Sequence, residues 1–102
     1  VWVSDIKKIK SADAAIVFGS VLRKFKEAGD IDTVLILDAK KYKKVQKEIE
    51  EVNKMSTKKI HPLFQTKQDF INNIKKGDKP LLNAIKGIYV FGEDLLIELM
   101  QK

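Results

Sequence analysis

The chain has 102 residues, of which 44% are apolar and 33% are charged, which is typical of one folded domain and excludes a disordered tail. It contains no cysteine and a single histidine, so disulfides, iron–sulfur clusters and thiolate zinc sites are excluded and any zinc site is disfavoured. The net charge is +6, and residues 40–59 carry eight lysines against three glutamates, which favours a polyanionic partner such as nucleic acid or a nucleotide phosphate.

The composition also bears on where the protein acts. Its longest apolar runs are far shorter than the ~20 residues needed to span a bilayer, and no signal segment opens the chain. We therefore expect a cytoplasmic protein that does not contact membranes. Enrichment in lysine and glutamate without cysteine is weakly typical of a thermophile protein, and the start at Val1 rather than Met is consistent with loss of an N-terminal piece.

The first half of the chain predicts a helix, a strand, a helix, a strand and a long helix. Apolar residues on one face predict a helix over residues 3–10, and a β-rich apolar run predicts a buried strand over residues 14–18. Residues 21–28 predict a short helix with its basic side chains outward. Residues 31–37 are the clearest strand, apolar on both faces near its end. Apolar side chains at i, i+3, i+7 and i+10 predict a helix over residues 39–53.

The second half predicts two strands and three helices. Residues 58–64 read as a strand, and the following residues 66–69 have the form of a capping box that opens a helix. Residues 81–86 predict a helical turn or two, and residues 88–91 a short strand bounded by glycines. The last helix is predicted over residues 93–100, with acidic side chains at its positive end.

This order of elements predicts an α/β or two-layer α+β domain with a small mixed sheet and helices packed on it, over residues 1–102. Pro62 cannot donate a hydrogen bond to a neighbouring strand, so its strand is expected at an edge of the sheet or to end there.

Four residues between the first two strands carry the chemistry. Asp30 and Asp32 are spaced i, i+2, so both carboxylates lie on one face of a strand, where they can converge on a hard cation such as Mg²⁺. Gly19 lets the backbone approach a ligand closely, and Ser20 adds a hydroxyl at the start of a helix whose amides can hold a phosphate. A phosphate cradle followed by a metal clamp predicts nucleotide chemistry.

The motif "GS…GDID" followed by "TVLIL" resembles the signature of the DNA polymerase beta-like nucleotidyltransferase superfamily. More narrowly, the chain is similar to the small prokaryotic minimal nucleotidyltransferases, which are often encoded beside a HEPN-domain partner in toxin–antitoxin pairs. The resemblance implies that Gly19 and Ser20 bind the triphosphate of ATP or another NTP and that Asp30 and Asp32 bind Mg²⁺. It also implies transfer of a nucleoside monophosphate to an acceptor hydroxyl, with release of pyrophosphate.

The sequence departs from the family pattern at two positions. Gly29 stands where the family commonly has serine, which is a minor change. The larger departure concerns a third carboxylate, which active members carry on the next strand and whose nearest matching position here is His61. Imidazole can accept a proton but is a poor ligand for Mg²⁺. Asp38 and Asp69 are possible substitutes, but the preferred interpretation of both is a residue that starts a helix.

Two surfaces leave alternatives open. Lysines crowd the start of the helix over residues 39–53, namely Lys40, Lys41, Lys43 and Lys44, and they form either a solvated face or an attraction site for a nucleotide or polynucleotide. Without exposed aromatic residues between them, a groove for single strands is not supported. The apolar face over residues 95–100 is either core or an interface for a HEPN-domain protein or a second copy of this chain.

Three functions follow as hypotheses. The first is a Mg²⁺-dependent nucleotidyltransferase with Asp30, Asp32 and His61 as its catalytic residues. The second is a weak or inactive nucleotidyltransferase-like partner protein of the antitoxin type, and the third is a basic nucleic-acid-binding module. The acceptor stays open among a protein tyrosine or serine, a tRNA end and a small antibiotic hydroxyl.

Overall fold

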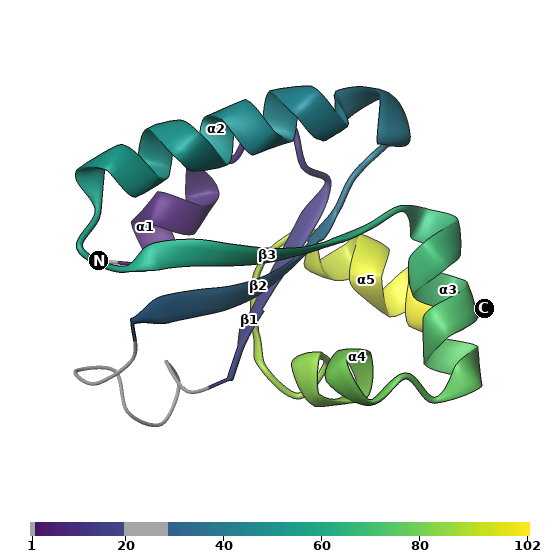
Figure 1. Ribbon diagram of the computed structural model, residues 1–102. Coiled ribbons are helices and arrows are strands. Elements are labelled where there is room, and N and C mark those ends of the chain that lie inside the picture. The colour runs from purple at the N-terminus through teal and green to yellow at the C-terminus, as the bar shows by residue number, and fades with distance from the viewer. Residues whose placement is uncertain (1, 20–28) are drawn as a thin grey trace.

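The computed structural model describes residues 2–19 and 29–102 (Figure 1). The predicted helix over residues 21–28 and the predicted phosphate ligand Ser20 lie outside the described residues. The elements in chain order are α1 (Trp2–Lys7), β1 (Ala14–Phe18), β2 (Asp30–Ile36), the 3-10 helix η2 (Ala39–Lys41), α2 (Tyr42–Met55), β3 (Lys59–Gln65), α3 (Lys67–Lys76), α4 (Lys79–Ala84), β4 (Ile88–Phe91) and α5 (Glu93–Met100).

The strands form one mixed four-stranded sheet in the order β3-β2-β1-β4. β1 pairs antiparallel with both β2 and β4, whereas β2 and β3 are parallel and are joined through α2. The predicted α+β fold with a small mixed sheet is confirmed. β3 lies at an edge of the sheet, as Pro62 predicts, because the proline nitrogen would leave a neighbouring strand without a donor.

Helices cover both faces of the sheet (Figure 1). Successive strand residues point to opposite faces, and because the strands carry apolar residues at successive positions, both faces are apolar and need to be covered. On one face Ala15, Val17, Ile31 and Leu35 pack with α1 and α2. On the other face the core joins the sheet to α3, α4 and α5; its fully buried members include Ile16, Val34, Ile36, Phe70, Leu81 and Leu96. Leu96 and Leu99 of α5 are buried here, so that part of the predicted apolar face is core.

Short polar side chains start the helices, as the sequence predicts. Asp38 accepts a hydrogen bond from the Lys40 amide and caps η2. Thr66 and Asp69 form the predicted capping box of α3, in which each side chain accepts a hydrogen bond from the other residue's amide. The interpretation of Asp38 and Asp69 as residues that start helices is therefore confirmed.

Two details of α2 differ from the sequence pattern. Tyr42 is the first of the four apolar positions whose spacing predicts this helix and so was expected on its buried face, but it is 41% exposed, and an exposed aromatic residue therefore lies within the lysine cluster. Glu48, which lies four residues after Lys44 on the helix, accepts two hydrogen bonds from Ser11 and so ties α2 to the segment after α1. That contact joins residues 37 positions apart, which local spacing cannot predict.

The second core also holds one tyrosine with a shifted pKa. Tyr89 donates a hydrogen bond to the carbonyl of Ile85. Burial, and then the charge of Glu93, raise the pKa of this phenol. The hydroxyl therefore stays a donor inside the fold, and its role is structural.

Across residues 2–19 and 29–102, the helices are all too short or too polar to cross a lipid bilayer.

Candidate functional site

Three of the predicted site residues meet at one end of the sheet. Gly19 directly follows the last residue of β1, Asp32 lies near the start of β2, and His61 lies near the start of β3. The register places Phe18 opposite Asp32 on one side and His61 opposite Asp32 on the other. Asp32 and His61 therefore project from neighbouring strands on the same face of the sheet, the face that carries α3, α4 and α5.

Gly19 packs closely against the carboxylate of Asp32. Its φ is +85°, a left-handed conformation that glycine adopts without steric strain. A Cβ atom at this position would collide with Oδ2 of Asp32. The sequence predicts that this glycine permits a close approach, and the structure shows one, between the backbone and a predicted metal ligand.

Asp32 and His61 are in direct contact. Nδ1 of His61 lies 3.1 Å from Oδ1 of Asp32, and the two side chains are 71% and 32% exposed respectively. A carboxylate oxygen only accepts hydrogen bonds, so the proton of this bond belongs to Nδ1. In the neutral imidazole this leaves Nε2 as the proton-accepting nitrogen.

Asp30 lies two residues before Asp32 on the same face and is exposed. Its cross-strand neighbour on β3 is Lys59. The Lys59 ammonium donates instead to the carbonyl oxygens of Asn53 and Ser56, at the end of α2. The basic neighbour is therefore directed toward the opposite helix layer, and the carboxylate of Asp30 faces solvent.

These residues fit a magnesium–nucleotide ligand better than a metal held by protein alone. Among the described residues no group of three histidine, aspartate or glutamate side chains could hold a metal ion. Mg²⁺ usually keeps several waters and takes one or two carboxylates together with substrate phosphates. Two carboxylates on one strand face, exposed at Asp30 and half-buried at Asp32, lie beside a glycine whose backbone can approach a phosphate and match that second arrangement.

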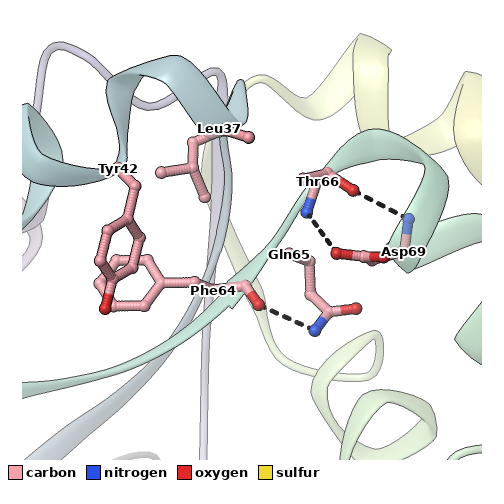
Figure 2. A pocket seen from close by; sticks show the side chains of 7 residues that line it. Leu37, Tyr42, Phe64, Gln65, Thr66 and Asp69 are labelled. Carbon is pink, nitrogen blue, oxygen red and sulfur yellow. Dashed lines mark hydrogen bonds between the residues drawn. The ribbon is translucent and has the colours of Figure 1, made fainter.

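The far end of the same two strands holds an open groove that the sequence did not predict (Figure 2). It has a volume of about 370 Å³ and is lined by Leu37, Ala39, Tyr42, Phe64, Gln65, Thr66 and Asp69. The rings of Tyr42 and Phe64 meet edge to face, with centroids 4.8 Å apart. In the sequence, the one sign of this groove was the aromatic residue Tyr42 inside the lysine cluster. Its pairing with Phe64 could not be predicted, because it depends on tertiary packing.

The chain was compared with protein-family models, with curated proteins and with solved structures, and none of them matches it. Membership of the nucleotidyltransferase superfamily therefore stays a prediction from the sequence.

Proposed function

We propose that the protein is a Mg²⁺-dependent nucleotidyltransferase that acts in the cytoplasm. The proposal rests on one observation: Gly19, which follows β1, lies against Asp32 on β2, and Asp32 contacts His61 on β3 on the sheet face that also carries Asp30. In this proposal Asp30 and Asp32 hold Mg²⁺, and Gly19 with Ser20 receives the phosphates of ATP or another NTP. The ion would neutralise phosphate charge and help to align the reacting groups.

The proposed reaction is a displacement at the α-phosphorus. The acceptor oxygen forms a bond to this phosphorus, the bond from phosphorus to the bridging oxygen breaks, and pyrophosphate leaves with that electron pair. The proton of the acceptor hydroxyl passes to Nε2 of His61, which the hydrogen bond from Nδ1 to Asp32 leaves free to accept it. His61 thus takes the proton-accepting role of the carboxylate that the sequence lacks on β3, while metal binding falls to Asp30 and Asp32.

The test is a calorimetric titration of ATP into the protein, with Mg²⁺ and then with EDTA, beside the Asp30→Asn/Asp32→Asn double variant. We expect binding that requires Mg²⁺ and is lost in the double variant. The matched control is Asp94→Asn, an exposed aspartate in the first turn of α5, which should bind as the wild type does. Equal binding by the wild type and the double variant would overturn the proposal.

The His61→Asp variant tests the proposed metal site beside Asp32 separately from the proton-accepting role of His61. This variant places a third carboxylate opposite Asp32, where a hard oxygen ligand suits Mg²⁺. We expect tighter binding of Mg²⁺–ATP and at least equal pyrophosphate release. Weaker binding in this variant would mean that the site does not hold a metal ion beside Asp32.

A second candidate is a non-catalytic partner protein of the antitoxin type, paired with a HEPN-domain protein. It is favoured by the neighbour of Asp32 on β3, which is an imidazole rather than a carboxylate and occupies one carboxylate oxygen. In this case the protein would bind its partner, release no pyrophosphate, and keep at most residual affinity for nucleotide. Purification with a co-expressed HEPN-domain protein, combined with a pyrophosphate assay of the complex, distinguishes the two candidates.

A further inference from the structure

The groove at the far end of the sheet lies where the chain parts to opposite faces. After β2 the chain turns into η2 and α2, and α2 packs on one face of the sheet through Val45 and Ile49. After β3 it turns into α3, which packs on the other face through Phe70. The carboxyl ends of two parallel strands whose connections leave in opposite directions form a crevice, and this is where open α/β sheets commonly bind ligands.

The groove continues along this end of the sheet. A second hollow, of about 300 Å³, shares Leu37, Ala39 and Thr66 with the first, and Lys67 lies in its wall. The combined groove is therefore longer than one small pocket. It runs from the aromatic pair Tyr42 and Phe64 to the start of α3, as Figure 2 shows for the first part.

Four exposed lysines flank Tyr42, at the aromatic end of the groove, in the sequence. Lys40 and Lys41 stand in the chain between two groove-lining residues, Ala39 and Tyr42, and are exposed. Lys43 and Lys44 follow in the first turn of α2 and are also exposed. Lysines at the amino end of a helix oppose its dipole, which is unfavourable for each charge. A bound polyanion would offset that repulsion.

Three aspartates line the combined groove, Asp13, Asp38 and Asp69, and Asp13 is exposed at the second hollow. Asp69 accepts a hydrogen bond from the Thr66 amide in the capping box, and Asp38 accepts one from the Lys40 amide. Both of these carboxylates are therefore held at the starts of helices. Their remaining lone pairs can accept hydrogen bonds from the exocyclic amino groups of a base. Phosphates would meet the exposed lysines that flank Tyr42 in the chain.

We propose that this groove binds an unpaired strand of nucleic acid, with a base stacked against Tyr42 and Phe64 and the phosphates along Lys40, Lys41, Lys43 and Lys44. Aromatic rings beside a basic track are the features with which proteins hold single strands. A paired base could not enter, because its faces are stacked within the duplex. A free nucleotide carries its phosphates at one point, whereas these lysines extend over η2 and the first turn of α2.

This proposal is independent of the nucleotidyltransferase site. Asp32 and Leu37 are five residues apart on a strand, which is about 17 Å, and the aromatic pair and Asp32 lie on opposite faces of the sheet. Removal of the carboxylates at Asp30 and Asp32 should therefore leave strand binding intact, so failure of either proposal can be recognised separately.

The test is fluorescence anisotropy with labelled oligo-dA and oligo-dC strands about twelve nucleotides long, whose bases carry exocyclic amino groups, beside a duplex of the same length and ATP as a competitor. Tyr42→Ala should weaken binding of single strands by about five-fold to a hundred-fold, the range expected for loss of one stacked base. Met55→Ala, at the other end of α2 and 85% exposed, is the matched control and should bind as the wild type does.

The lysines are tested through the salt dependence, which a purely structural residue would not change. Between about 50 and about 200 mM salt, each phosphate contact contributes about −0.7 to the slope of log K against log salt concentration. Lys40→Gln/Lys41→Gln should make the slope shallower, whereas Lys75→Gln/Lys76→Gln, at the far end of α3, should leave it unchanged. The proposal is overturned if the wild type binds no single strand at the lowest salt concentration, or if it binds the duplex equally well. It is also overturned if ATP alone displaces the strand completely, or if Tyr42→Ala and Lys40→Gln/Lys41→Gln bind like their control variants.

Discussion

The two ends of the β2–β3 pair differ in both shape and chemistry. At the amino end, carboxylates, a left-handed glycine and a histidine lie on an open face, and close contacts such as that of Gly19 with Asp32 fix their positions. At the carboxyl end, a groove of about 370 Å³ offers aromatic rings and is flanked by lysines. The first arrangement suits a metal-bound phosphate, and the second suits a base and a phosphodiester backbone.

One small sheet can carry two separate binding sites because the two ends of the β2–β3 pair are built differently. Parallel strands carry α2 and α3 away on opposite faces at the carboxyl end, which opens a groove there. At the amino end the carboxylate of Asp32 is fixed by its contacts with Gly19, which follows β1, and with His61 on β3. Variants at the two ends should consequently have separable effects.

The largest expected effect on binding is at the amino end. Asp32→Asn should weaken Mg²⁺-dependent binding of ATP by at least about a hundred-fold, because even residues that only orient a metal ligand cost 10- to 100-fold in affinity. The same variant should bind single strands normally, and Tyr42→Ala should show the reverse pattern. Calorimetry and anisotropy on the same two proteins give the comparison. Parallel losses in both assays would mean that the two ends form one site.

The next effect is on stability near Asp32. Gly19→Ala forces a side chain into a left-handed conformation and into the Asp32 carboxylate, which should lower the free energy of unfolding by about 1–3 kcal/mol. Gly29→Ala is the matched control, since no atom lies within 4 Å of the added Cβ there. Urea denaturation of both variants measures the difference. Equal midpoints would show that the close packing at Gly19 is not required.

At the carboxyl end, loss of the capping box should have a moderate effect. Thr66→Ala removes the acceptor for the Asp69 amide and should lower the free energy of unfolding by about 1 kcal/mol. Thr57→Ala, an exposed threonine before β3, makes the same chemical change without a cap. Thermal unfolding of the pair measures the difference, and Mg²⁺-dependent ATP binding should be unchanged in both. A loss of ATP binding in Thr66→Ala would contradict the separation of the two ends.

The smallest expected effect on stability belongs to His61. Its contact with Asp32 is exposed, so His61→Ala should change the free energy of unfolding by less than about 1 kcal/mol. Pyrophosphate release should nevertheless fall by roughly 10²–10⁴-fold if His61 accepts the proton. A stable variant with unchanged turnover would remove His61 from the proposed reaction and would leave it as a surface residue.

Local patterns predicted most of the fold. β1 and β4 have the predicted bounds, the capping box at Thr66 is present, and α2 continues two residues beyond Asn53 to Met55. These features depend on neighbours within a turn or a strand, which the sequence displays directly. The candidate metal pair was also visible, because Asp30 and Asp32 share one strand face through their spacing alone.

What could not be predicted depends on distant pairings. The parallel register that sets His61 opposite Asp32 joins residues 29 positions apart, and only the family resemblance indicated it, because nothing in either strand alone specifies it. Helical periodicity placed Tyr42 in the core, but its side chain is exposed. Periodicity shows which residues share a helix face, and it does not show which part of that face is covered in the folded chain. The groove was missed because that exposure brings Tyr42 against Phe64 only in the folded chain.

The most direct test of the account is paramagnetic broadening of backbone amide signals by Mn²⁺ in place of Mg²⁺, in the presence of ATP. We expect the broadening to be strongest at Ile31, Asp32 and His61, weak at Leu37 and Thr66, and lost in Asp30→Asn/Asp32→Asn. Broadening centred on Leu37 and Thr66, or broadening that persists in the double variant, would contradict the assignment of the metal–nucleotide site to the amino end of the β2–β3 pair.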